Sequence, residues 1–382
     1  MIRPLVWLGG LVLVLALLDT WLAARETRAR DEERRVGALF KPDEAENLRK
    51  QPAFRVELAG EAHSYGRVES QWRCLSYHKA PADARAVQSL LDGIAQAEGI
   101  VHASTSEEAP AFGINTPRTL RVSIQGPRAM QDRGGDVLAT LEIGSAQGGR
   151  EGCFVRKKGT PEVWSIASDL RAPLERRIAP GLPPLLEPAA VPAAWLEQGG
   201  GAVRIVLARG TERTVLERRE RALDPAAMQP GMLPWTWVLA GGGASELDVT
   251  LDDGVAGAFT GFLERLPYVA VLDPERKDAL GLGTPQATVT LEPRAGAPLV
   301  LAFGASDAQK PVALWVATSN TLFQVTAETL RLALPEPGLL TAERAENAEN
   351  PWSAVLRAAG SAPSEPSPFG GPGPGVLGGV PR

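Results

Sequence analysis

The residue type best suited to acid–base chemistry is histidine, and the chain has three: His63, His78 and His102. A histidine can transfer protons near neutral pH when a second polar group is placed beside it. All three lie in the first half of the chain, and none has a counterpart in the second half. His63 and His78 fall in segments that predict loops. We interpret them as surface residues, predict no catalytic residue and expect no enzyme.

Two cysteines, Cys74 and Cys153, are the candidates for nucleophilic, redox or metal chemistry. Neither belongs to a CxxC pair, and the histidines do not cluster, so the usual zinc arrangements are missing. In an oxidising compartment the two thiols could form one disulfide. The alternative is two small buried residues. The sequence leaves both open, and we predict no metal site.

Two further motifs suggest ligands only at first sight. Glycine triplets at 199–201 and 241–243 could belong to phosphate-binding loops, but neither leads into Gly-Lys-Ser/Thr, so we interpret them as flexible turns. The pair Asp252–Asp253 precedes an apolar helical pattern, where carboxylates cap a helix N-terminus. We therefore predict a helix cap there and no cofactor.

Tryptophans are the remaining candidates for recognition. Trp235 and Trp237 lie two residues apart on a predicted strand, and paired aromatic rings can form a platform for glycans. Alternate strand positions are buried, however, which favours a core role for most of the strand tryptophans. Trp235 and Trp237 are our candidate binding aromatics.

The overall composition excludes one class of partner. The chain has 382 residues, enough for two or three domains with their own cores. Its 40 basic and 45 acidic residues give a net charge of −5, without the basic excess that attracts a phosphate backbone. We expect no nucleic-acid partner.

Residues 5–24 form an apolar run with a single charge at Asp19. At about 1.5 Å per residue, a helix of this length crosses a hydrocarbon core of roughly 30 Å. A cleaved signal peptide is the competing interpretation, but Leu22 would occupy a position where cleavage needs a small residue. We predict a transmembrane anchor over residues 1–24, in contact with lipid through residues 5–24, and a charged helical linker over 25–50. The flanking arginines alone do not decide the orientation.

The body of the chain repeats one pattern. The segment Ala111–Pro117 (AFGINTP) recurs as Ala279–Pro285 (ALGLGTP), and each copy follows two strand-like runs and an amphipathic helix. Because Gly113 and Gly281 can adopt positive φ, and Pro117 and Pro285 preset the chain direction, we interpret these four as structural turn residues.

Each turn precedes a similar series of strands. Alternation at Leu120–Ile124 and at Ala287–Leu291 starts an antiparallel meander in each copy. The two phases differ by one residue, so we predict a bulge near residues 118–120. The fold class is α+β, with two tandem duplicated domains, each an antiparallel sheet packed by an amphipathic helix.

Composition shifts place the domain boundaries. We predict repeat 1 over 51–178, a Pro/Gly-rich connection over 179–201 and repeat 2 over 202–345. Residues 346–382 are expected to form a short helix and a disordered Pro/Gly-rich tail.

The order of these elements resembles the DUF4340 family. Phe112–Arg118 and Leu280–Gln286 carry the resemblance best, supported by the Gly-ended strands at Gly144 and Gly304. The resemblance implies a membrane-tethered, extracytoplasmic protein, found with ABC-transporter subunits of the gliding-motility type and without an established enzymatic activity. It implies no catalytic residue.

These observations lead to one functional hypothesis and one alternative. We expect a single-pass inner-membrane protein with a periplasmic body, which acts as a non-catalytic accessory or scaffold of a membrane complex. Its expected partners are the permease or auxiliary subunits of an ABC-type transporter. The alternative is an extracytoplasmic module that binds envelope polysaccharide or another ligand, with the paired tryptophans as its binding surface.

Overall fold

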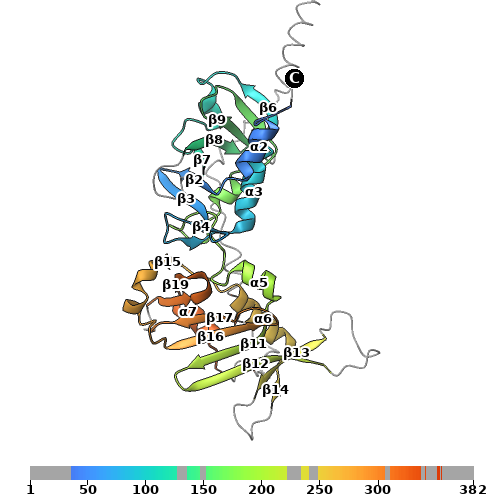
Figure 1. Ribbon diagram of the computed structural model, residues 1–382, viewed down its shortest axis with the longest axis vertical. Coiled ribbons are helices and arrows are strands. Elements are labelled where there is room, and N and C mark those ends of the chain that lie inside the picture. The colour runs from blue at the N-terminus through green and yellow to red at the C-terminus, as the bar shows by residue number, and fades with distance from the viewer. Residues whose placement is uncertain are drawn as a thin grey trace, which may run out of the picture. The chain divides into compact units, whose positions relative to one another are not determined.

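The computed structural model describes two compact units (Figure 1). The described residues are 36–126, 136–146, 152–221, 234–240, 248–305, 310–336, 340, 351, 352 and 354. Unit 1 contains the described residues up to Arg177 together with Pro183–Leu186, and unit 2 contains Ile178–Leu182 and those from Glu187 onward. The predicted anchor and tail lie outside the described residues. Within the described ranges, no helix is both long and apolar enough to cross a membrane.

Unit 1 is an antiparallel sheet of ten strands in the order β1-β6-β10-β9-β8-β7-β2-β3-β4-β5. Its elements are β1 (Gly37–Ala38), α2 (Pro42–Arg49), β2 (Ala53–Leu58), β3 (Glu61–Val68), β4 (Gln71–Cys74), β5 (Ala80–Pro81), α3 (Ala84–Ala95), β6 (Glu98–Ala103), the 3₁₀ turn η1 (Ala109–Phe112), β7 (Leu120–Gln125), β8 (Val137–Ala146), β9 (Cys153–Lys157), β10 (Val163–Ile166) and α4 (Ala172–Glu175).

Unit 2 is an antiparallel sheet of nine strands in the order β14-β13-β12-β11-β16-β17-β18-β19-β15. Its elements are α5 (Ala193–Gly199), β11 (Ala202–Arg209), β12 (Glu212–Glu220), β13 (Trp235–Ala240), β14 (Val249–Thr250), α6 (Asp253–Glu264), β15 (Ala270–Leu272), η4 (Pro274–Arg276), η5 (Asp278–Leu280), β16 (Ala287–Pro293), β17 (Leu299–Phe303), β18 (Val312–Val316), η6 (Ala317–Ser319), β19 (Thr321–Val325) and α7 (Ala327–Ala333).

The two sheets have the same strand order. Reading across unit 1 from β6 gives β6-β10-β9-β8-β7-β2-β3-β4-β5, and reading across unit 2 from β15 gives the nine counterparts in the same sequence. In each unit one helix connects the two strands at opposite ends of this order: α3 connects β5 to β6, and α6 connects β14 to β15. The predicted α+β class with two antiparallel sheets is therefore confirmed. Among the described residues, β1 is the additional strand of unit 1.

The helix connecting these strands buries one apolar face in each unit, as the sequence pattern predicts. In α3 this face consists of Val87, Leu90, Leu91 and Ile94, and in α6 of Val255, Phe259, Phe262 and Leu263. Both helices begin at an aspartate cap. The Asp83 carboxylate accepts from the Arg85 N–H at 2.9 Å, and the Asp252 carboxylate accepts from the Val255 N–H at 3.0 Å. The pair Asp252–Asp253 therefore starts a helix, as expected.

The sequence did not predict β1, β3, β5 and β6 in unit 1 or β12, β14 and β15 in unit 2. Of these, β3 and β12 lie between the first predicted strand of each unit and its tryptophan-bearing strand. In β12 only Leu216 is buried, and the strand extends to Glu220. In β3 only Tyr65 and Gly66 are buried, so His63 lies on a strand and not in a loop. Neither strand has the apolar alternation that would reveal it.

The extra residue of the first copy lies in a turn, so the predicted bulge is wrong. The Thr119 N–H donates to the Thr116 carbonyl at 3.0 Å, and the regular strand begins only at Leu120. From there Leu120 pairs with Ile143, and in unit 2 Ala287 pairs with Phe303. The phase difference is absorbed before the sheet starts, where an insertion leaves the pairing intact.

Two segments that were expected to be peripheral contribute to the cores. Residues 42–49 are helical, as predicted, but Ala45 and Leu48 of this helix are buried, and β1 pairs with β6. At the other end, Trp352 is buried, and its indole N–H donates to the Leu332 carbonyl at 3.0 Å. Unit 1 thus begins before residue 51, and the core of unit 2 includes a residue beyond 345.

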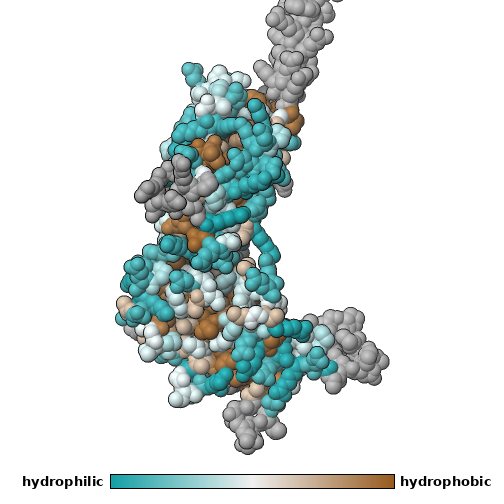
Figure 2. All heavy atoms as spheres, in the orientation of Figure 1, coloured by the Kyte–Doolittle hydropathy of each residue, from teal (hydrophilic) through white to brown (hydrophobic). Residues whose placement is uncertain are grey.

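The surface of both units is largely hydrophilic on the face that Figure 2 shows, with hydrophobic residues visible in separate small groups. Among the described residues, the large hydrophobic side chains that are exposed are Val36, Val137, Leu138, Val249 and Val269. Scattered exposure of this kind is usual for a folded domain.

The signature turn is held against the sheet by a close backbone contact in both units. Gly113 and Gly281 have φ of 75° and 74°, the left-handed conformation predicted for them. The carbonyl of the preceding residue then lies over a second glycine. In unit 1 the Phe112 carbonyl lies over Gly144 of β8, and in unit 2 the Leu280 carbonyl lies over Gly304, directly after β17. A Cβ on Gly144 would overlap the Phe112 oxygen, and one on Gly304 would lie 2.6 Å from the Leu280 oxygen.

This contact makes a prediction about stability. Gly304→Ala should lower the free energy of unfolding by about 1–3 kcal/mol, because the added methyl group forces the turn away from the sheet. The matched control is Gly257→Ala in α6, where an added Cβ meets nothing within 4 Å. That change should be neutral or stabilise by about 0.5–1 kcal/mol. Denaturant midpoints measure both, and equal midpoints for the two variants would contradict the prediction.

Candidate functional site

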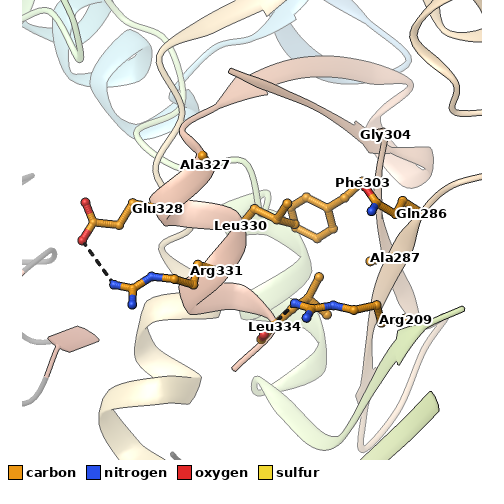
Figure 3. A pocket seen from close by; sticks show the side chains of 10 residues that line it. All are labelled: Arg209, Gln286, Ala287, Phe303, Gly304, Ala327, Glu328, Leu330, Arg331 and Leu334. Atoms are coloured by element: carbon orange, nitrogen blue, oxygen red, sulfur yellow. Dashed lines mark hydrogen bonds and ion pairs between the residues drawn. The ribbon is translucent and has the colours of Figure 1, made fainter. Parts of the chain in front are cut away.

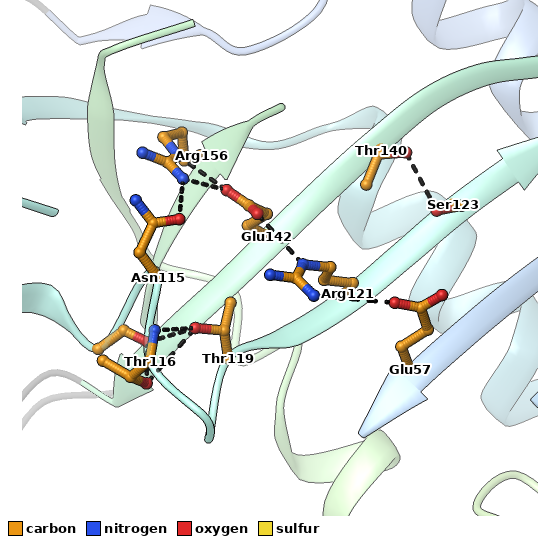
Figure 4. A network of polar contacts seen from close by, with 10 residues as sticks. Glu57, Asn115, Thr116, Thr119, Arg121, Ser123, Thr140, Glu142 and Arg156 are labelled. Atoms are coloured by element: carbon orange, nitrogen blue, oxygen red, sulfur yellow. Dashed lines mark hydrogen bonds and ion pairs between the residues drawn. The ribbon is translucent and has the colours of Figure 1, made fainter. Parts of the chain in front are cut away.

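A network of buried charges lies beside the signature turn of unit 1 (Figure 4). At its centre is Glu142 of β8, whose side chain is only 4% exposed. One carboxylate oxygen accepts from the Arg121 Nε–H at 3.2 Å, and the other accepts from the Arg156 Nε–H at 2.8 Å. The Asn115 side-chain oxygen in the turn accepts from the Arg156 guanidinium at 2.5 Å. Each carboxylate oxygen therefore accepts from an arginine of a neighbouring strand.

Threonines bind the same turn to itself. The hydroxyls of Thr116 and Thr119 each donate to the Gly113 carbonyl at 3.1 Å, and the Thr116 N–H donates to the Thr119 hydroxyl at 2.8 Å. Pro117 is exposed at the tip of this turn, as is Pro285 in unit 2. The four predicted turn residues thus lie in equivalent turns of the two units. They shape the backbone and present no reactive group.

Unit 2 places an apolar pair where unit 1 has the buried ion pair. Glu142 pairs in register with Arg156, and at the corresponding positions Ala302 pairs with Trp315. The Lys277 ammonium lies 4.6 Å from the centre of the Trp315 ring. The same sheet position therefore holds two chemically different pairs of side chains.

The candidate binding aromatics of unit 2 are partly removed from solvent. Trp237 is 1% exposed, and Trp235 is half-buried, with its ring centre 6.4 Å from that of Trp237. The Arg218 guanidinium lies 4.1 Å from the Trp235 ring centre and 5.1 Å from that of Trp237. In unit 1 Arg67 lies 4.9 Å over Trp72 at the matching register. An arginine stacked on a core tryptophan is thus a shared element of both sheets, which sequence reasoning missed.

The histidines occupy separate environments. His63 lies on β3 with its Nε2 3.7 Å from a Glu61 carboxylate oxygen, and burial lowers its pKa despite that neighbour. His78 lies in a turn with φ of 51°, and His102 lies on β6 with its ring 5.6 Å from that of Phe154. Within the described ranges, no three His, Cys, Asp or Glu side chains are placed to hold a metal ion.

Both cysteines are buried free thiols in separate strands. The Cys74 sulfur lies 3.7 Å from the Ser76 hydroxyl, and the Cys153 thiol donates to the Ser168 carbonyl at 3.4 Å. Burial raises the pKa of each thiol to about 11. Of the two interpretations that the sequence left open, the structure shows two small buried residues.

The fold of unit 1 defines a class of protein: an α+β domain built on one antiparallel sheet, with a buried ion pair between Glu142 and Arg156. Comparison with known families then assigns the domain. The family described as "Domain of unknown function (DUF4340)" matches residues 72–179, so this part of the chain belongs to DUF4340, as the sequence resemblance indicated. Searches of curated proteins and of solved structures gave no match.

The buried network can be tested by copying the solution found in unit 2. Glu142→Ala leaves Arg156 buried without its carboxylate and should lower the free energy of unfolding by about 3–5 kcal/mol. Adding Arg156→Trp recreates the Ala302–Trp315 pair and should recover much of that loss. Urea denaturation of the two variants and of Arg156→Trp alone measures the coupling. A double variant no more stable than Glu142→Ala would show that the network does more than fill the site.

The thiols make a second prediction. Because both are buried and their pKa is about 11, the native chain at neutral pH should react with a thiol reagent only slowly, and two thiols should react after unfolding. The raised pKa also makes the free energy of unfolding depend on pH. It should fall as the pH rises from 9 toward 11, because the thiols ionise in the unfolded state before they ionise in the folded state. Counting thiols in denaturant without reductant checks the first point, and a disulfide would give none.

Proposed function

We propose that this chain is a non-catalytic accessory or scaffold protein of a membrane complex. It is anchored by residues 5–24 in the inner membrane, its two units lie on the periplasmic side, and it works with an ABC-type transporter of the gliding-motility type. The observation that carries the proposal is the DUF4340 match in unit 1, together with the apolar run that precedes the folded part. That run has the length and composition of a membrane span.

We further propose that unit 2 is a second domain of the same kind, so that the chain contains a tandem duplication. Three shared elements support this. The nine-strand order is common to both sheets. Both turn glycines have positive φ, and the carbonyl of the residue before each lies against a second glycine, Gly144 or Gly304. Arg218 stacks on Trp237 as Arg67 stacks on Trp72. Independent folds would have little reason to share a side-chain pair that neither turn nor strand order requires.

The contacts of the charged groups also support a scaffold. Glu142 has both oxygens occupied, Arg204 of β11 is held between Glu217 and Glu292 at 3.0 and 2.9 Å, and Asp252 caps a helix. An acid or base in catalysis needs a lone pair or a proton that faces the substrate. Glu142 and Arg204 instead form ion pairs with residues of neighbouring strands.

The partner is tested by purifying the full chain from detergent-solubilised membranes. We expect transporter permease or auxiliary subunits to co-purify and to be identified by mass spectrometry. A deletion of residues 5–24 is the matched control, because it should abolish recovery from the membrane fraction. Recovery of the full chain as a lone monomer under mild detergent would contradict the proposed complex.

The orientation is tested by cysteine labelling. Lys158 lies in an exposed turn of unit 1, whereas both native cysteines are buried. Lys158→Cys should therefore react with a membrane-impermeant maleimide from the periplasmic side of intact spheroplasts, and the unchanged chain should serve as the background. Labelling that occurs only after the membrane is permeabilised would place the body in the cytoplasm and overturn the proposed location.

A further inference from the structure

Unit 2 contains a pocket of about 510 Å³ that no step of the proposed function uses (Figure 3). It lies where β11 ends, β16 begins and β17 ends, and α7 borders it. This volume is in the range of small-ligand sites, roughly 300–1,000 Å³. The residues that line it are Arg209, Gln286, Ala287, Phe303, Gly304, Ala327, Glu328, Leu330, Arg331 and Leu334.

The lining combines apolar walls with charges at the mouth. The side chains of Phe303, Leu330 and Leu334 form the apolar part, and Phe303 is fully buried. The charged residues Arg209, Glu328 and Arg331 are exposed at the rim. An apolar cavity with a few polar groups on one side is suited to a ligand that has both kinds of surface.

Arg209 is the pocket cation whose guanidinium is held in place by a hydrogen bond to the backbone. Its guanidinium donates to the Leu334 carbonyl at 3.1 Å, and no carboxylate lies within ion-pair distance of it among the described residues. Arg331, in contrast, lies 3.9 Å from Glu328, with both side chains well exposed. A guanidinium has five N–H donors, so one carbonyl leaves most of the Arg209 donors for an anion.

Comparison with unit 1 shows that two residues of the pocket lining differ between the units. Ile166 and Val325 are equivalent, because each is the last paired residue of the final meander strand, β10 or β19. Five residues further along the chain, Arg171 of unit 1 therefore corresponds to Leu330 of unit 2. In unit 1 Arg171 donates to the Gly144 carbonyl and pairs with Glu175, which corresponds to Leu334. Unit 1 fills this place with its own charged pair, whereas unit 2 has two leucines and an open pocket.

We propose that the unit 2 pocket binds a ligand carrying a carboxylate beside a short apolar group. The carboxylate lies on Arg209, and the apolar group lies against Phe303, Leu330 and Leu334. Two guanidinium groups and one carboxylate at the rim leave a net charge of +1, which matches one carboxylate better than a doubly charged phosphate. The ligand's source is either a free short-chain acid or the C-terminus of a polypeptide. The proposal concerns unit 2 alone and does not rest on the proposed membrane complex.

The test is a titration of the full chain by calorimetry with two acids and their neutral analogues. Hexanoate is paired with hexan-1-ol, and acetyl-Gly-Gly-Leu is paired with its C-terminal amide. Saturable binding of either acid, with the neutral analogue about tenfold weaker or more, supports the proposal. Binding of hexanoate alone identifies a free acid, and binding of the peptide alone identifies a chain terminus. Absence of saturable binding for both acids, or equal binding of acid and neutral analogue, overturns it.

Variants locate the binding in this pocket. Arg209→Gln should weaken binding about tenfold or more, while Arg213→Gln, an exposed arginine on the neighbouring strand, should leave it unchanged. Leu330→Arg copies the residue that fills this place in unit 1 and should abolish binding with the fold retained. Thermal unfolding by circular dichroism checks each variant. If Arg209→Gln does not fold, Leu330→Arg decides, and unchanged affinity in a folded Leu330→Arg chain rules the pocket out.

Discussion

The contact between the signature turn and the glycine that it faces, Gly144 or Gly304, is the constraint on which each sheet depends. The turn residue Gly113 or Gly281 reverses the chain through a left-handed conformation, and this places the preceding carbonyl on Gly144 or Gly304. No side chain fits between them. Because the turn directly precedes β7 or β16, this contact fixes where the meander begins, and through strand pairing it fixes the register of the strands that follow.

Once the backbone is fixed in this way, the side chains on the sheet can diverge. A buried ion pair gains Coulomb energy but loses the hydration of both charges, so an apolar pair of similar volume can be equally or more favourable. The two units show both outcomes at one register position, Glu142–Arg156 in unit 1 and Ala302–Trp315 in unit 2. Replacing only one partner of the ion pair is destabilising, because the other charge is then left unpaired in a buried site.

Sequence reasoning found the elements whose pattern is carried by apolar residues. The helices α3 and α6, the meander strands and both turn glycines follow from periodicity and from glycine's conformational freedom. Among the strands it missed are β3 and β12, because a strand such as β12 with one buried residue, Leu216, looks like a polar loop. Such strands are held by backbone pairing with neighbours on both sides, and a single sequence carries no sign of that pairing.

The polar features were hidden for a related reason. Glu142 lies between Leu141 and Ile143, and strict alternation predicts an exposed carboxylate there, but the sheet is covered on both faces at this point. Its partner Arg156 comes from another strand, so only the register joins them. The same holds for the unit 2 pocket, whose walls come from separate strands and α7. Where two units have the same strand order, the residues they share explain the fold, and so a function particular to one unit has to be sought at positions where the units differ.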